Sequence, residues 1–204
     1  MNICAENLRD LYYRLLVSVG TGEEEANTTA DVLIDADLHG LETHGALRIP
    51  PYINVAKQNV IEAGNKPHIE WQRGAISLIN GNNGWGQPAA KLAVSEVIAN
   101  AKQHGLGAAG IFNTNHIGTC AYYGRLLAKA GLIGFVTTNS PPNMPPTGAA
   151  EPVLGTNPIC FSAPASGDRV VVVDMATSVV AKGKVLLAAE RGEPIPTGWA
   201  VDQN

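Results

Sequence analysis

Three polar side chains recur at helical spacing in the first third of the sequence and could bind a carboxylate. His44 lies in the tripeptide Thr43-His44-Gly45, and Arg48 and Tyr52 follow at intervals of four residues. If a helix begins early enough to include them, all three share one face. A guanidinium grips a planar anion with two hydrogen bonds, and a tyrosine hydroxyl can donate another. The same spacing also suits a solvated or interface face, so both interpretations stay open.

A further histidine, His116, lies in the segment Asn113-Thr114-Asn115-His116-Ile117-Gly118, between an expected strand and an expected helix. Loops in such places hold catalytic groups on rigid elements. Imidazole is the natural general acid or base near neutral pH. The alternative is a loop histidine that only caps backbone groups.

A third candidate segment follows a run of four valines that ends at Val173. Asp174-Met175-Ala176, with Thr177 and Ser178 behind it, places a carboxylate and two hydroxyls at the carboxyl end of an expected strand. Ligands often lie at this end of strands. Asp174 could equally be the N-terminal residue of a helix. The turn at residues 155–158 could approach a ligand with its backbone or serve only as a turn.

Two familiar sites are excluded by context. Residues 105–110 match the dinucleotide fingerprint G-x-G-x-x-G, but a helix is expected before them and a strand after them, the reverse of the Rossmann arrangement. His39 and His44 are five residues apart, which is not the i, i+4 spacing of helical metal ligands, and no carboxylate triad accompanies them. We therefore expect no metal site.

The elements that must position these residues change in character near residue 67. Before it, apolar periodicity predicts helices over 8–19, from a Thr21/Glu24 capping box to about residue 39, and over 46–59 with Pro50 and Pro51 in the first turn. After it we predict strands 69–71, 75–79, 107–112, 132–138 and a buried strand 170–173, helices 87–104, 119–130 and 179–191, and an ordered loop 141–158. This pattern predicts an N-terminal helical region, 1–66, and a sheet-containing region, 67–204. The fold class is α+β / α/β, with N-terminal helices and a mixed, non-Rossmann sheet under helical cover.

Composition narrows the partners. The 204 residues carry 14 Lys and Arg against 18 Asp and Glu, a net charge of −4, without a block of like charge. We therefore expect no nucleic-acid binding and no membrane binding. The sequence start lacks a signal peptide, and no apolar run approaches the roughly 18 residues of a membrane span, so we expect a cytoplasmic protein. The odd, widely spaced cysteines Cys4, Cys120 and Cys160 are typical of buried thiols in a reducing compartment.

In combination, the motifs resemble the malate/L-lactate dehydrogenase family. This non-Rossmann group also contains sulfolactate, ureidoglycolate and diketogulonate dehydrogenases, and the resemblance covers the whole chain. The motifs, in order, are Thr43-His44-Gly45 with Arg48, Gly86-Gln87, His116-Ile117-Gly118, Asn139-Ser140, Gly155-Thr156-Asn157-Pro158, Asp174-Met175-Ala176-Thr177-Ser178, Gly183-Lys184 and Ile195-Pro196-x-x-Trp199-Ala200-x-Asp202.

The resemblance implies an L-sulfolactate dehydrogenase-like fold and a homodimer. It also implies an oxidoreductase that reversibly transfers a hydride between NAD(P) and the C2 position of a small 2-hydroxy/2-oxo acid. NAD is the family default, and the sequence does not decide between NAD and NADP. Region 67–204 would then bind the cofactor.

The resemblance also implies roles for single residues. His116 would be the proton donor and acceptor at the C2 oxygen, while His44, Arg48 and Tyr52 would orient the substrate and its carboxylate. Ser140 and the segment Asp174, Met175 and Ala176 would contact the dinucleotide.

Two departures from the family pattern matter. Thr43 stands where the family usually has serine, which keeps the hydroxyl and adds a methyl group. Family members also continue beyond the position of Asn204 with a segment that supplies part of the cofactor pocket and dimer contacts. The alternative function is therefore a catalytically inactive truncated or split-gene fragment, acting only as a folded fragment or as a subunit completed by a second polypeptide.

Overall fold

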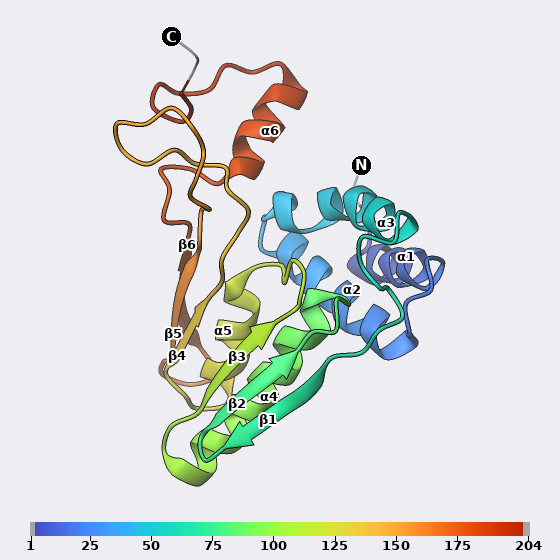
Figure 1. The fold of residues 1–204 in the computed structure, drawn as a ribbon, viewed down its shortest axis with the longest axis vertical. Coiled ribbons are helices and arrows are strands. Elements are labelled where there is room, and N and C mark those ends of the chain that lie inside the picture. Colours follow the sequence, from blue (N-terminus) through green and yellow to red (C-terminus); the bar gives the residue numbers. More distant parts are fainter. Residues whose placement is uncertain (1–2, 202–204) are drawn as a thin grey trace.

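The computed structural model describes residues 3–201, which form helices and two small sheets (Figure 1). Asp202, the last residue of the C-terminal motif, lies outside the described residues. Among the described helices, none has the length and apolar character needed to span a membrane.

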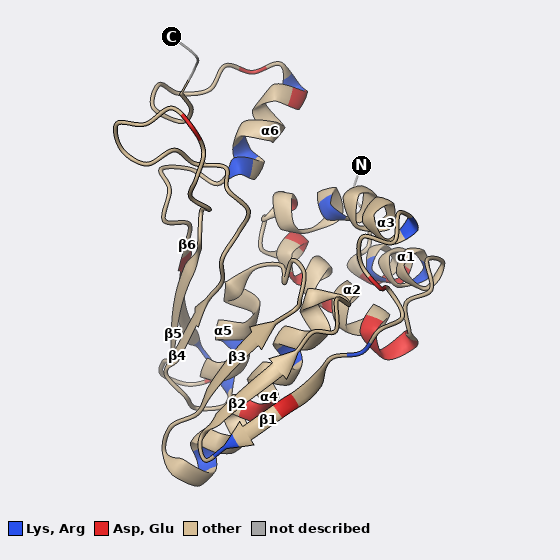
Figure 2. Cartoon of the chain, in the orientation of Figure 1, with Lys and Arg blue, Asp and Glu red and all other residues tan. Residues whose placement is uncertain are grey.

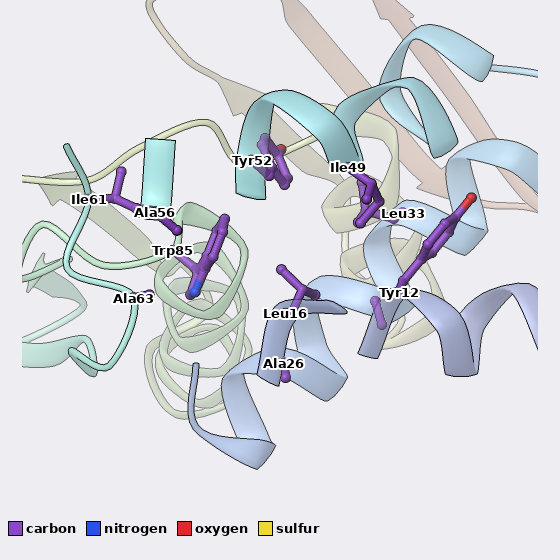
Figure 3. Close-up of a cluster of buried hydrophobic side chains, with 11 residues drawn as sticks. Tyr12, Leu16, Ala26, Leu33, Ile49, Tyr52, Ala56, Ile61, Ala63 and Trp85 are labelled. Carbon is purple, nitrogen blue, oxygen red and sulfur yellow. The ribbon is translucent and has the colours of Figure 1, made fainter. Parts of the chain in front are cut away.

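The first part of the chain is helical. Helices α1 (Ala5–Val17) and α2 (Glu23–Leu38) pack against each other, two 3-10 turns follow, η1 (Glu42–His44) and η2 (Ala46–Arg48), and α3 (Ile49–Lys57) carries its prolines in the first turn. Their apolar faces meet in one core, which includes Leu16, Leu33, Tyr52 and Trp85 (Figure 3). The single helix predicted over 46–59 is therefore a 3-10 turn followed by α3.

The predicted capping box at the start of α2 is wrong. Gly22 is the N-cap residue and no side chain caps this end of the helix. The Thr21 hydroxyl instead accepts a 2.8 Å hydrogen bond from the indole N–H of Trp85. Since a buried indole N–H needs an acceptor, the core takes this hydroxyl and the helix end goes without it.

The first sheet has the order β1-β2-β3, with β1 (His68–Arg73), β2 (Ile76–Asn80) and β3 (Ala108–Phe112). β1 and β2 are antiparallel, whereas β2 and β3 are parallel and joined by the long helix α4 (Gly86–His104). The sequence 105–110 therefore has a helix before it and a strand after it, which confirms that it is not a Rossmann fingerprint.

The second sheet is antiparallel, with the order β4-β5-β6: β4 (Gly134–Thr137), β5 (Ile159–Pro164) and β6 (Val170–Met175). Helix α5 (Cys120–Lys129) covers one of its faces, and Gly124 allows the close approach because a Cβ there would lie 2.8 Å from the Cys160 sulfur. Strand β5 was not predicted, since its six residues follow the proline-rich loop directly. The strands predicted for one mixed sheet thus form two sheets, and only the first of them is mixed.

Two expectations about burial are wrong. The valine strand is half exposed. Val171 and Val173 face solvent, because they lie on the face of the second sheet that α5 does not cover. Among the cysteines, Cys120 at the start of α5 and Cys160 in β5 are buried, but Cys4 is exposed just before α1. The last described helix, α6 (Lys182–Arg191), begins three residues later than predicted, after a bend at 177–180.

Candidate active site

The four residues predicted to be catalytic lie together. Tyr52 comes from α3, His44 from η1, Arg48 from η2, and His116 from the loop between β3 and α5. The rings of His44 and His116 are stacked with centroids 5.7 Å apart, and Tyr52 meets the His116 ring edge-on at 6.0 Å. The helix predicted to carry His44, Arg48 and Tyr52 on one face is not continuous, because Gly45 separates the two 3-10 turns η1 and η2. The three side chains nevertheless lie close together.

Tyr52 connects this site to the protein core. Its ring is buried and packs against Trp85, while its hydroxyl lies 2.6 Å from His116 Nδ1. The backbone N–H of Gly118 also points at Nδ1, at 3.2 Å. Because an N–H can only donate, His116 Nδ1 is an acceptor, and the neutral ring carries its proton on Nε2.

Gln87 is a site residue for which the sequence suggested no role. It is completely buried, and its Nε2 donates a 2.8 Å hydrogen bond to the Tyr52 hydroxyl. Tyr52 must therefore donate its own proton to His116, which fixes the direction of the chain Gln87, Tyr52, His116. Gly86 makes the placement possible, since a Cβ there would lie 2.2 Å from the carbonyl oxygen of Asn115. The pair Gly86-Gln87 was the available sequence signal.

Arg48 is held in place by a backbone carbonyl, near both histidines. Its Nε donates to the carbonyl oxygen of Thr43 at 2.7 Å, and the Thr43 hydroxyl lies 3.0 Å from His44 Nδ1. No acidic side chain within residues 3–201 forms an ion pair with Arg48. A guanidinium without a carboxylate partner beside two imidazoles is suited to bind an anion.

The electrostatics favour neutral histidines. Desolvation by burial and the nearby Arg48 charge lower the pKa of His44 from 6.5 to about 4. The side chain of His116 is partly exposed, yet its pKa also lies well below the ordinary value. The largest cause is desolvation of the ring by surrounding protein atoms, and the nearby charges of Arg48 and His44 add to it. Burial raises the pKa of Tyr52, so its hydroxyl remains a donor.

Asp37 was not recognised from the sequence, because on α2 it falls among positions that read as apolar helix face. One carboxylate oxygen accepts a 2.7 Å hydrogen bond from the buried Tyr12 hydroxyl, and the other accepts the backbone N–H of Ala46 at 3.0 Å. Gly45 lies so close that a Cβ would overlap the carboxylate. Asp37 therefore fixes the turn that carries His44 on one side and Arg48 on the other.

The residues predicted to contact a dinucleotide lie in the second sheet and its loops. The Ser140 hydroxyl accepts the backbone N–H of Thr156 at 2.8 Å, and the backbone N–H of Thr177 donates to the Thr156 carbonyl at 2.9 Å. These bonds bring Ser140 and Thr177 to the same turn at 155–158. Thr177 directly follows the segment Asp174, Met175 and Ala176.

Asp174 caps a helix, but not a helix that follows it. Its carboxylate accepts the backbone N–H of Ala121 at 2.7 Å, in the first turn of α5 and close in sequence to His116. A negative charge is favourable at a helix N-terminus. Asp174 therefore fastens β6 to the helix that follows the His116 loop.

A large cleft of about 1070 Å³ adjoins the site, between α4 with β3 on one side and α5 with β4 on the other. Thr114 and Ile117, which flank His116, line one part of it, and Asn139 and Asn157 line another. None of its lining residues is charged. The Thr114 hydroxyl is buried without a hydrogen-bond partner and packs against Gly81, where a Cβ would lie 2.8 Å from it. No group of three or more metal-binding side chains occurs within residues 3–201.

The comparison with known proteins identifies the family. The family model described as malate/L-lactate dehydrogenase matches residues 3–204. A malate/(S)-sulfolactate dehydrogenase from Methanothermus fervidus is 43% identical over 204 residues, which are 100% of this chain and 60% of that protein. A ureidoglycolate dehydrogenase (NAD(+)) from Escherichia coli O157:H7 is 38% identical over 204 residues, again the whole chain and 58% of the relative.

Solved structures agree. Malate dehydrogenase from Entamoeba histolytica superposes with a TM-score of 0.92 at 32% identity, covering 96% of this chain and 55% of the other. Sulfolactate dehydrogenase from Methanocaldococcus jannaschii gives a TM-score of 0.88 at 37% identity, covering 96% and 57%. The expected L-sulfolactate dehydrogenase-like fold is confirmed. The chain spans somewhat more than half the length of the relatives that it matches.

The Asp37 contacts predict a coupling in stability. Asp37→Ala removes the acceptor of a buried tyrosine hydroxyl and of the Ala46 N–H, and should lower the free energy of unfolding by about 1–3 kcal/mol. In a Tyr12→Phe background the hydroxyl that needs this acceptor is absent, so Asp37→Ala should cost less there. The two substitutions should therefore be non-additive in a double-mutant cycle measured by urea unfolding. Asp10→Ala, at an exposed ion pair on α1, is the control and should change stability by less than about 0.5 kcal/mol. Additive effects of the Asp37 and Tyr12 substitutions would contradict this role.

The lowered pKa of His44 predicts a pH dependence of stability. Below pH 6.5 the unfolded chain takes up a proton at His44 that the folded chain refuses until about pH 4. Stability should thus fall as the pH falls through this window, with His44 contributing less than about 1.4 kcal/mol per pH unit, because the side chain is partly exposed. His44→Gln should flatten the urea-unfolding profile between pH 6.5 and 4. Above pH 7 the two proteins should differ by a constant amount, and parallel profiles throughout would refute the assignment.

Proposed function

The chain belongs to the malate/L-lactate dehydrogenase family, and on that premise we propose that its site serves reversible hydride transfer between NAD(P) and C2 of a small 2-hydroxy/2-oxo acid. The observation that carries the proposal is the hydrogen-bonded chain from Gln87 through Tyr52 to His116, with His44 and Arg48 beside it. Such an arrangement offers one tunable acid/base and one anion-binding group in the same place.

The substrate carboxylate is the ligand proposed for Arg48. The Thr43 carbonyl fixes Nε of this side chain, so the rest of its guanidinium can meet a carboxylate in a defined orientation. His44, kept neutral by burial and by Arg48, would add a hydrogen bond without adding charge. The extra methyl group of Thr43, compared with the serine usual in the family, would narrow this part of the site.

His116 is proposed to exchange a proton with the C2 oxygen through Nε2. Since Nδ1 accepts from Tyr52 and from the Gly118 N–H, the neutral ring presents Nε2–H. In the reducing direction the ring would take up a second proton at Nδ1 and give its Nε2 proton to the developing alkoxide, which leaves the ring neutral. In the oxidising direction Nε2 of that neutral ring would receive the hydroxyl proton, and Nδ1 would then release its own. Tyr52 and Gln87 hold the ring in place and set its tautomer.

A nicotinamide cofactor fits the cleft between β3 and β4. The cleft is large enough for a dinucleotide, and Ile117, next to His116, is among the residues that line it. Asn139 and Asn157 would hold polar groups of the cofactor, and Ser140 with the segment Asp174, Met175 and Ala176 would contact it from the adjacent turn. When bound, the cofactor supplies or accepts the hydride.

Two finer parts of the proposal, the cofactor and the assembly, come from the resemblance to the family, and a third, the location, comes from the sequence. NAD is proposed ahead of NADP, the assembly is a homodimer, and the location is cytoplasmic. The proposal includes no metal, no nucleic acid and no membrane among the partners.

The chain covers 60% and 58% of two relatives' length, so the activity of the 204 residues by themselves is the first quantity to measure.

The decisive assay follows NADH and NADPH oxidation by the purified chain with a panel of 2-oxo acids that includes oxaloacetate, pyruvate and oxalurate. Turnover with one of them would support the enzyme. Silence of the 204 residues by themselves, followed by turnover once the unmatched part of the Methanothermus fervidus relative is added, would support the reaction and show that it needs that part. Silence in both arms would refute the proposed reaction.

In whichever form turns over, His116→Ala should lower turnover by about 10² to 10⁴, the usual contribution of a general acid/base. Tyr52→Phe should cause a smaller loss, because only the orienting hydrogen bond disappears. His104→Ala, at the exposed end of α4, is the matched control and should retain full turnover. Near-normal turnover of His116→Ala would contradict the role given to this histidine.

A further inference from the structure

We propose that Asn115 is a positioning residue of the hydride-transfer site, which holds His116 at the distance and orientation that its contact with Tyr52 requires. This role rests on the proposed function, because the orientation of His116 matters only if that ring exchanges a proton with the substrate. The observation behind it is a closed ring of contacts, in which Asn115 joins the His116 loop to the segment that carries Gln87.

The side chain of Asn115 is half-buried and contacts the loop that follows β2. Its Nδ2 donates a 2.8 Å hydrogen bond to the carbonyl oxygen of Gly84. The carbonyl oxygen of Asn83 and its side-chain Oδ1 each lie 3.3 Å from the same nitrogen. Because an amide group has two N–H donors, Asn115 can hold both residues of this loop at once.

These bonds close a ring around the site. The loop after β2 leads directly into α4, whose second residue is Gln87. Gln87 donates to the Tyr52 hydroxyl at 2.8 Å, and that hydroxyl lies 2.6 Å from His116 Nδ1. From His116 the ring returns through Asn115 to Gly84, in the segment that leads to Gln87. Each contact therefore limits the movement of the next, and without Asn115 the His116 loop would lose its side-chain tie to the start of α4.

The backbones of the two loops are close together and locally constrained. A Cβ at Gly86 would lie 2.2 Å from the carbonyl oxygen of Asn115, and the backbone N–H of Asn83 donates to the carbonyl oxygen of Asn113 at 2.9 Å. Asn83 and Asn113 both have positive φ angles, 51° and 49°. Residues other than glycine keep such a conformation only where surrounding contacts hold them, and they cluster at functional sites. The Asn115 amide is one of those contacts.

Hydrogen bonds, and not ion pairs, hold the two loops together. Neither the loop between β2 and α4 nor the loop between β3 and α5 contains Lys, Arg, Asp or Glu (Figure 2). A hydrogen bond fixes direction as well as distance. Loss of the Asn115 amide should therefore change the orientation of the His116 ring, since no charged pair between the loops takes its place.

The expected defect concerns proton transfer and not anion binding. The Thr43 carbonyl fixes Arg48 and Asp37 fixes its turn, and neither contact involves the two loops that Asn115 joins. A catalytic group misplaced by about 1 Å can lower a rate by about 10²-fold. A change at Asn115 should thus lower kcat while the Michaelis constant for the oxo acid stays nearly the same.

Asn115→Asp tests this role, because a carboxylate has the shape of the amide but no N–H to donate. Asn115→Ala, which adds no charge, is the second variant. NMR of protein labelled at the histidine nitrogens reports the His116 tautomer without any need for turnover, and His116→Ala assigns the signals. In the wild-type protein we expect a protonated Nε2 and an unprotonated Nδ1, and in both variants a mixture of the two tautomers. In the form that turns over, kcat should fall about 10- to 100-fold and KM should change less than about threefold.

Asn65→Asp is the matched control. Asn65 Nδ2 donates a 2.9 Å hydrogen bond to the carbonyl oxygen of Asn82, in the loop after β2, but it comes from the segment before β1 and not from the His116 loop. This control should keep the wild-type tautomer and the wild-type kcat. Circular dichroism verifies the folding of each variant.

A single wild-type tautomer in both Asn115 variants, or a loss of kcat that Asn65→Asp reproduces, would overturn the positioning role. Failure of both Asn115 variants to fold would also overturn it, since the side chain would then serve the fold as a whole. If the wild-type protein does not turn over, the proposed function fails, whereas the NMR comparison still decides whether Asn115 orients the His116 ring.

Discussion

The site depends on one constraint, which is the burial of the Tyr52 hydroxyl. The Tyr52 ring is part of the core formed by α1, α2, α3 and Trp85, so its position is set by apolar packing. A buried hydroxyl must find partners, and Gln87 and His116 provide them on opposite sides of its oxygen. The helical region therefore orients His116, which belongs to the sheet-containing part of the chain, through the 2.6 Å contact of Tyr52 and the stacked ring of His44.

Close backbone approaches make this contact geometrically possible. Gly86 lets the start of α4 lie against the His116 loop, and a Cβ at Gly118 would come within 2.6 Å of Val32 on α2. Gly183, in the first turn of α6, contacts Thr43 in the same manner, next to His44. These glycines explain why the motifs are glycine-containing segments of two or three residues, because each glycine lets two segments approach more closely than any other residue would allow.

Much of this arrangement could be predicted from the sequence, because most helices and strands follow from local periodicity and His116 stands between a strand and a helix. The failures have local causes. The hydroxyl of Thr21 has two competing uses, and only the tertiary structure shows that Trp85 takes it. Strand β5 adjoins a proline-rich loop and lacks a boundary signal of its own. Asp37 and Gln87 act through neighbours distant in sequence, so periodicity carries no information about them.

The two parts of the proposed site differ in how far residues 3–201 enclose them. The substrate side is formed by buried or hydrogen-bonded groups, with Asp37 fixing the turn of His44 and Arg48. On the cofactor side, β3 pairs only with β2 and β4 only with β5 among the described strands, and an uncharged cleft separates them. Hydride transfer requires a site from which water is excluded. The substrate side meets this requirement through its buried groups, whereas the cleft of about 1070 Å³ on the cofactor side would lose its water to the bound cofactor itself.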